Sequence, residues 1–291
     1  MSKFLTTYKT KLQNYWSLTK SLQTGLLLTT GVAGFMSARC PFLNWTTVLQ
    51  VAGSLFLAVS GSTILNMWYD RDIDAKMHRT CARPFPTGEV KPIEGLILGA
   101  IISAIGVGWA LSMDLLYGSI VFAGLFFDVV VYTLWLKRRT AWSIIWGGIS
   151  GGMPILAGRA FGLGYVDWIG ILLSLAILFW IPTHILTFSM RYRKDYQRAG
   201  IPTFPSTYGD AFTIRLIAAS SVLVAIAITA SAIGLGLTFG FLRLLAVLSF
   251  GLILLAFSSI IKPSERLNFG LFKYASLFML STMLVLIAQA I

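Results

Sequence analysis

The sequence has few charged residues and few of the side chains that bind transition metals. Only 12% of its 291 residues are charged, whereas soluble domains carry about 25%, and this deficit excludes a soluble globular protein. Its two histidines and two cysteines, Cys40 and Cys81, do not form the closely spaced Cys/His clusters of zinc sites. The two cysteines fall on opposite sides of the membrane in the topology predicted from the apolar stretches, so we expect no disulfide between them.

Long apolar stretches fill most of the chain, which is 56% hydrophobic with a mean hydropathy of +0.78. Nine stretches each approach the roughly 20 residues that a helix needs to cross a bilayer. They cover residues 22–38, 45–68, 93–112, 115–136, 141–162, 167–190, 212–236, 241–261 and 270–290. We therefore predict an all-α membrane protein, a bundle of nine transmembrane helices in a single domain covering residues 1–291. The Gly-rich stretch 141–162 is expected to face protein or a cavity, because only such neighbours satisfy its loosened backbone.

The positive charge is concentrated in alternate connections between the apolar stretches. Apart from Arg39, Arg159 and Arg243, every Lys and Arg lies in the N-terminal segment or in or beside the second, fourth, sixth and eighth connections. Because cytoplasmic connections are rich in Lys and Arg, we expect a multi-pass protein of the cell membrane with a cytoplasmic N-terminus and an outside C-terminus. Residues 1–20 carry apolar side chains at helical spacing between lysines, which predicts an interfacial helix on the cytoplasmic face and not a signal peptide. No separate basic domain exists, so the net charge of +12 indicates contact with membrane lipid and not with nucleic acid.

Three of the chain's 11 acidic residues lie together where the second apolar stretch ends: Asp70, Asp72 and Asp74. Asn66, Asp70 and Asp74 are spaced by four, so a continuing helix places them on one face and Asp72 on the other. Carboxylate and amide oxygens suit Mg²⁺, which bridges carboxylates to substrate phosphates. The alternative is a solvated helix end whose acids pair with the next cations along the chain, but an amide one turn deeper in the membrane favours a functional site.

A second acidic motif follows the sixth apolar stretch. Asp195 lies in the basic string Arg191–Tyr196, and a proline-rich turn, residues 200–205, comes after it. The first motif is followed by a similar turn, residues 83–88. This arrangement indicates a weak internal duplication with two cytoplasmic motifs facing one cavity; the alternative is coincidence between two short turns.

These motifs carry a resemblance to a known family. The column Asn66-x₃-Asp70-x₃-Asp74 and the later acidic loop resemble the UbiA superfamily of intramembrane prenyltransferases, and within it the haem-farnesylating branch. Four strings support the resemblance in family order: Tyr15–Lys20, Tyr69–Thr80, Tyr132–Thr140 and Arg193–Pro202. Three departures from the family pattern fall where the acceptor is expected: Thr19-Lys20-Ser21-Leu22 for Thr-Lys-Pro-Arg, Gly152-Met153-Pro154-Ile155 for Ala-x-Pro-Pro, and Pro182-Thr183-His184 for Pro-Pro-His.

The resemblance implies transfer of a farnesyl group from farnesyl diphosphate to the vinyl group of haem B, giving haem O for a downstream haem A synthase. An allylic diphosphate ionises when its leaving group is neutralised, and Mg²⁺ held by carboxylates does this. The expected metal ligands, which are also the catalytic residues, are Asn66, Asp70, Asp74 and Asp195. The expected substrate contacts are Arg83, Lys137, Arg138, Arg193 and Lys194, which suit phosphate oxygens, and His184.

Several assignments stay open at this stage. His184 lies within the sixth stretch, and three roles are open for it. It is a ligand of the haem iron, a base near the acceptor, or a partner in a hydrogen bond between two helices. Asp128 is an acid inside the fourth stretch, and its side chain either pairs with a neighbouring polar side chain or faces the cavity. A quinone precursor or a lipid is the alternative acceptor. A secondary transporter is a further alternative, although transporters place their acids near the bilayer midplane and not at one edge.

Overall fold

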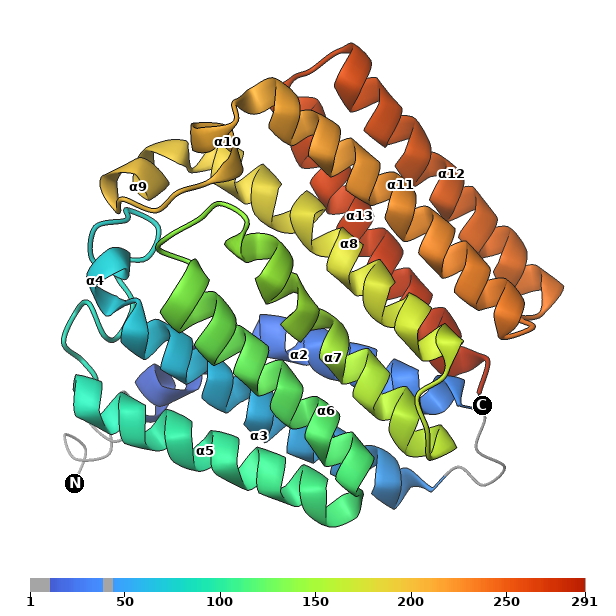
Figure 1. The fold of residues 1–291 in the computed structure, drawn as a ribbon, viewed down its shortest axis with the longest axis horizontal. Helices are drawn as coiled ribbons and strands as arrows, with labels where there is room; N and C mark the ends of the chain where they lie inside the picture. The colour runs from blue at the N-terminus through green and yellow to red at the C-terminus, as the bar shows by residue number, and fades with distance from the viewer. Residues whose placement is uncertain (1–10, 39–43, 291) are drawn as a thin grey trace, which may run out of the picture.

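The apolar stretches form long helices in the computed structural model, which describes residues 11–38 and 44–290 (Figure 1). The long helices are α2 (Ser21–Ser37), α3 (Trp45–Tyr69), α5 (Pro92–Met113), α6 (Leu115–Phe126), α7 (Ser143–Leu163), α8 (Trp168–Arg191), α11 (Asp210–Gly234), α12 (Phe239–Ile261) and α13 (Glu265–Ala288). The short helices are α4 (Arg71–Asp74), α9 (Arg193–Arg198) and α10 (Phe204–Thr207). Helix α6 continues into a π-helix, η1 (Phe127–Leu136). No strand occurs in the described residues, and each predicted stretch overlaps one long helix or the α6–η1 pair.

Seven of the described helical segments are long and apolar enough to cross a membrane: α3, α5, α6 with η1, α8, α11, α12 and α13. Helix α2 has 17 residues, or about 25 Å at 1.5 Å per residue, which is short of a hydrocarbon core of about 30 Å. Helix α7 contains Gly residues, Pro154 and the buried Arg159. The protein is thus a multi-pass helical membrane protein, and a total of nine crossings stays a prediction.

Helix α7 lies in the interior of the bundle, against α2, α6, η1 and α8. Glycines on both α7 and α2 allow this close packing: a Cβ on Gly158 of α7 would lie 2.0 Å from the Gly31 carbonyl oxygen, and one on Gly34 of α2 would lie 2.1 Å from the Ile155 oxygen. Small residues let membrane helices approach closely. The stretch predicted to face protein therefore does so.

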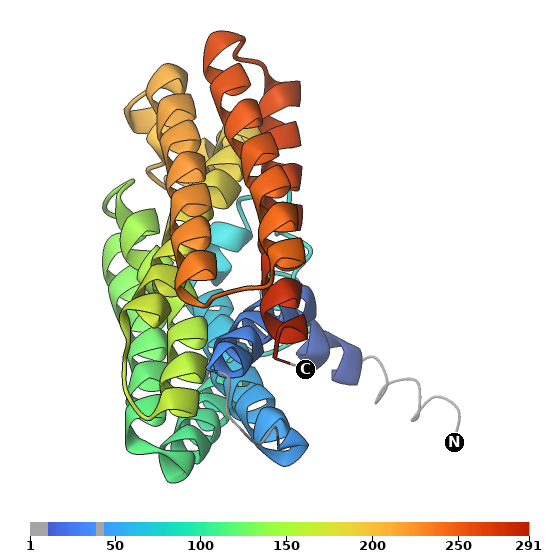
Figure 2. The ribbon, with the colours of Figure 1, turned by 90° about the vertical axis from the view of Figure 1, so that its right-hand side faces the viewer.

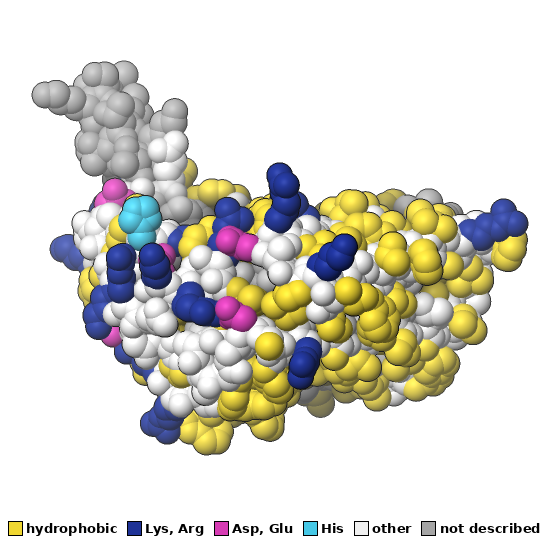
Figure 3. Space-filling view, turned by 90° about the horizontal axis from the view of Figure 1, so that it is seen from above, with side chains coloured by type: hydrophobic (Ala, Val, Ile, Leu, Met, Phe, Trp, Pro, Cys, Tyr) yellow, Lys and Arg dark blue, Asp and Glu magenta, His cyan; other side chains and the backbone are white. Residues whose placement is uncertain are grey.

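The connections that carry the acidic motifs lie at one end of the bundle (Figure 1), and the view turned by 90° also shows them close to each other (Figure 2). Helix α4 with the loop after it packs against the loop after α9 through Ile73, Met77, Ala199 and Ile201. Most of the Lys and Arg side chains visible in Figure 3 gather with acids at this end, whereas the rest of that face is largely hydrophobic. The C-terminus lies at the opposite end.

Part of the predicted interfacial segment is described. Residues 11–18 are helical, and the Tyr15 hydroxyl donates to Glu94 at 3.0 Å, which ties this helix to the start of α5. Residues 1–10, Arg39 and Cys40 lie outside the described residues. Cys81 is an exposed free thiol.

Candidate active site

The acidic motif continues the helical register of α3 into α4. The Asp70 N–H donates to the Asn66 carbonyl at 2.9 Å, and the Asp74 N–H donates to the Asp70 carbonyl at 2.8 Å. This i to i−4 pattern stacks the three residues along one face. Asp70 and Asp74 are each 4% exposed, whereas the Asp72 side chain is 53% exposed.

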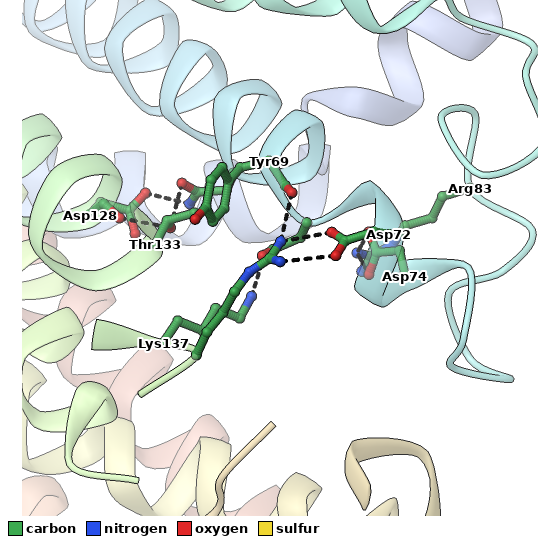
Figure 4. Close-up of polar contacts among 10 residues, drawn as sticks. Tyr69, Asp72, Asp74, Arg83, Asp128, Thr133 and Lys137 are labelled. Atoms are coloured by element: carbon green, nitrogen blue, oxygen red, sulfur yellow. Dashed lines mark hydrogen bonds and ion pairs between the residues drawn. The ribbon is translucent and has the colours of Figure 1, made fainter. Parts of the chain in front are cut away.

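Each carboxylate of the motif is paired with a cation (Figure 4). Arg83 donates to both Asp74 oxygens, at 2.9 and 2.7 Å, and Lys137 pairs with Asp70. Arg138 donates to both oxygens of Asp72, at 2.9 and 2.7 Å, and these hydrogen bonds hold the pKa of the Asp72 carboxyl below its usual range.

The partners are thus not Arg71 and Lys76, the cations nearest along the chain. Lys137 and Arg138 come from the connection after η1, and Arg83 comes from the turn beyond α4. The alternative of a solvated helix end is wrong for Asp70 and Asp74, since both are buried.

A polar network inside the membrane fixes the Asn66 side chain. Asn66 Nδ2 donates to Asp128 Oδ2 at 2.7 Å, and the Thr133 hydroxyl donates to Asn66 Oδ1 at 2.8 Å. The Ser62 hydroxyl donates to the same Asp128 carboxylate. Asp128 and Thr133 both lie on η1, and π-helices occur often at functional sites.

The sequence did not predict this network. The only signal was Asp128 itself, an acid inside an apolar stretch that needs a partner. The structure answers the open question about that acid: it pairs with neighbouring polar side chains.

The second motif lies against the first. Asp195 is 8% exposed, and one of its carboxylate oxygens accepts a hydrogen bond from the Arg79 backbone N–H at 3.3 Å. In the described residues, no three or more His, Cys, Asp and Glu side chains lie close enough together to hold a metal ion. However, Asp70 Oδ1 is buried without a hydrogen-bond partner, so one hard oxygen ligand is free, and the donor set suits Mg²⁺.

A further lysine, Lys20, lies near these charges. Its backbone is left-handed with φ 45°, the only positive φ of a non-glycine residue in the described ranges. Burial, together with the charges of Arg83 and Lys137, lowers the pKa of Lys20 to about 8. The sequence placed Lys20 in a family string without assigning it a role.

The remaining predicted substrate contacts lie around α8 and α9. His184 packs between the rings of Trp180, Phe188 and Phe272, with centroids 4.9, 5.4 and 4.9 Å away. Its Nδ1 is buried without a partner, so the described residues do not show the helix–helix hydrogen bond considered for it.

Arg193 and Lys194 are not brought to the Asp70–Asp74 face. Arg193 pairs with Asp210, and Lys194 is exposed. Both line a separate cavity beside α8, together with Asp195.

Membrane-length helices with buried carboxylates and clustered cations at one end are the features expected of an intramembrane enzyme that acts on a diphosphate. The chain matches the model of the UbiA prenyltransferase family over residues 26–282, and it belongs to this family. It is therefore a prenyltransferase, and the family resemblance and the all-α fold predicted from the sequence are confirmed.

Relatives within the family are similar over most of their length. The protoheme IX farnesyltransferase of Archaeoglobus fulgidus is 45% identical over 199 residues, which is 68% of this chain and 70% of the relative. That of Korarchaeum cryptofilum is 39% identical over 219 residues, 75% of this chain and 74% of the relative.

Solved structures share the fold at lower identity. A digeranylgeranylglyceryl phosphate synthase superimposes with a TM-score of 0.80 at 19% identity, covering 96% of this chain and 98% of that one. A UbiA homologue from Archaeoglobus fulgidus bound to DMAPP and Mg²⁺ superimposes with a TM-score of 0.69 at 16% identity, covering 94% and 99%.

Proposed function

We propose that this chain transfers a farnesyl group from farnesyl diphosphate to the vinyl group of haem B, giving haem O and diphosphate. The observation that carries the proposal is the pair of carboxylates, Asp70 and Asp74, buried at one end of the bundle with Lys137 and Arg83 bound to them. A diphosphate needs both divalent metal and cations around it. The choice of haem as acceptor is supported by the relatives named protoheme IX farnesyltransferase.

Mg²⁺ is the proposed cofactor, with Asn66, Asp70, Asp74 and Asp195 as its ligands and the catalytic residues. The unpartnered Asp70 Oδ1 supports this assignment. Bound Mg²⁺ would neutralise the charge that develops on the departing diphosphate. A UbiA homologue has been solved with DMAPP and Mg²⁺ bound, which supports the choice of metal.

The basic side chains are proposed to bind the diphosphate. Arg83 and Lys137 already stand beside the acids and can turn to phosphate oxygens, with Arg83 bidentate. Arg138 is held over the Tyr69 ring at 4.5 Å, which fixes its guanidinium near the motif. Arg193 and Lys194 line the neighbouring cavity instead, and they are proposed to contact the acceptor there and not the diphosphate.

The apolar bundle provides the environment for the transfer. The C1–O bond breaks with its electron pair leaving on diphosphate, and the vinyl electron pair captures the allylic cation. Water then adds to the cation left on the vinyl group and releases a proton. Exclusion of bulk water protects the first cation until the acceptor reaches it. His184, among aromatic rings and without a partner for Nδ1, is proposed to face the haem.

The protein is proposed to lie in the cell membrane with its N-terminus in the cytoplasm and its C-terminus outside, and to pass haem O to a haem A synthase. Cysteine labelling from the two sides of sealed vesicles tests the orientation. Cys81, in the loop that follows α4, should react from the cytoplasmic side and Cys40 from the opposite side. Labelling of both from one side would contradict the orientation.

Mass spectrometry of the product tests the reaction. Purified protein is incubated with Mg²⁺ and farnesyl diphosphate, with either haem B or a quinone precursor such as 4-hydroxybenzoate. The proposal expects haem O with the first acceptor and no product with the second. Farnesylation of the quinone precursor alone would assign the chain to the other acceptor class.

A further inference from the structure

A cavity of about 710 Å³ lies beside the proposed donor site, between α8, α9, α11 and α13. Small-molecule sites typically measure about 300–1,000 Å³. Asp195, a proposed metal ligand, forms part of its wall, so a molecule in this cavity would border the donor site.

Hydrogen-bond donors without strong acceptors line this cavity. Thr187 is 3% exposed and its hydroxyl has no partner, and Arg193 Nε is also buried without one. Asn268 is 4% exposed; its Nδ2 meets only the Met190 sulfur, at 3.4 Å, and its Oδ1 has no partner, so both ends of this amide are open to a ligand. Leaving such buried groups without a partner destabilises the folded protein. Their convergence on one cavity fits a ligand that supplies acceptor oxygens.

The cavity wall carries three cations and three acids, and two of the cations form no ion pair with a described residue and are free to bind an anion. Arg191, whose guanidinium lies 4.4 Å from the Phe269 ring centre, has no ion-pair partner among the described residues, and Lys194 has none either. Two of the three acids in the wall are already engaged, since Asp210 pairs with Arg193 and Asp195 accepts from a backbone N–H. The third, Glu265, is exposed at the start of α13.

An aromatic wall leads from the cavity into the bundle. Tyr192 lines the cavity, and its ring stacks on that of Phe188 with the centroids 5.8 Å apart. The Phe188 ring in turn contacts the ring of His184. On the facing helix, Phe269 stacks on Phe272 at 5.5 Å. A planar apolar ring system with acidic groups on one edge matches this layout.

We propose that this cavity holds the carboxylate edge of the acceptor: Arg191, Arg193 Nε, Thr187 and Asn268 bind the two propionates of haem B. The porphyrin ring lies along the aromatic wall with His184 at its far end. This inference rests on the proposed function and adds the part of the chain that selects a dicarboxylate acceptor.

Absorbance titration with haem B and with haem B dimethyl ester, which lacks free carboxylates, tests the proposal on the full-length protein. The unchanged protein should bind haem B about 10–100-fold more tightly than the diester, since charged hydrogen bonds contribute about 1.5–3 kcal/mol. Arg191→Gln and the isosteric Thr187→Val should each reduce this preference, and the double variant should nearly abolish it. The KM for farnesyl diphosphate should stay unchanged for Thr187→Val.

Arg243→Gln is the matched control, because Arg243 is also an exposed arginine over a phenylalanine, 4.2 Å from the Phe239 ring centre, at a site away from the cavity. It should keep the full preference for haem B. Equal binding of haem and diester by the unchanged protein, or a preference that survives the double variant with an unchanged melting temperature, would overturn the inference. If the protein makes haem O but uses the diester equally well, only this inference fails; if it makes no haem O, the proposed function fails.

Discussion

The amide of Asn66 donates to the carboxylate of Asp128 at 2.7 Å, joining the acidic end of α3 to the π-helix η1. The contact orients Asn66, a proposed metal ligand, through Asp128, which is not a proposed ligand. Because Thr133 and Ser62 bind the same pair, the Asn66 side chain is fixed before any substrate arrives. Such outer partners control ligand geometry in metal sites.

Replacing Asp128 by asparagine should therefore weaken the metal site and leave the fold intact. Asp128→Asn keeps the size of the side chain but removes the charge that holds the Asn66 amide. We expect the Mg²⁺ concentration for half-maximal transfer to rise about 10–100-fold, measured by haem O production across a Mg²⁺ series. The exposed Asp72→Asn serves as control, and an Asp128→Asn curve that overlays it would refute a positioning role.

The three aspartates of the motif should differ in their effect on transfer. Asp70→Ala or Asp74→Ala should lower kcat by at least about 10²-fold, since both buried carboxylates face the proposed diphosphate site. Asp72→Ala should cost less than about tenfold, because its ion pair with Arg138 is exposed and such pairs contribute about 1 kcal/mol or less. Steady-state rates with each variant, after a thermal melt to check folding, decide the matter. An equal loss of kcat in all three variants would contradict the proposal that the metal is bound by one face of the helix.

Much of the fold could be predicted from the sequence, because bilayer thickness sets helix length and apolar composition marks each helix. The stretch 115–136, however, was expected as one regular helix, and it changes to π geometry at Phe127. That change depends on which hydrogen bonds the backbone makes, and no hydrophobic period signals it.

The candidate site could be predicted only where residues are close in sequence. The four-residue spacing gave the stack of Asn66, Asp70 and Asp74. The partner of Asp70 is Lys137, 67 positions away, and this pairing depends on how η1 packs against α3. Local spacing contains no information about such a contact.

The close packing of α2 on α7 should make Gly158 sensitive to a single methyl group. Gly158→Ala places a Cβ 2.0 Å from the Gly31 carbonyl oxygen, and overpacking of this kind costs about 1–3 kcal/mol. The melting temperature in detergent should fall. Gly108→Ala on α5 is the control, because a Cβ there meets nothing within 4 Å and alanine favours a helix over glycine. A melting temperature no lower for Gly158→Ala than for the control would contradict the interhelical contact.

Lys20 should make stability depend on pH at alkaline values. Burial, with the charges of Arg83 and Lys137, lowers the pKa of Lys20 from 10.5 to about 8 in the folded protein. Between these two values the unfolded chain binds a proton that the folded chain has lost, so the free energy of unfolding rises with pH. Below about pH 8 both states are protonated, and the folded state bears the full cost of the partly buried charge. Lys20→Met removes that cost at every pH, so its melting temperature should exceed that of the unchanged protein most at pH 7.5, and the gap should shrink toward pH 10. The exposed Lys76→Met should show a difference that does not vary with pH. A constant gap for Lys20→Met over this range would mean that Lys20 keeps an ordinary pKa and that its charge is not desolvated.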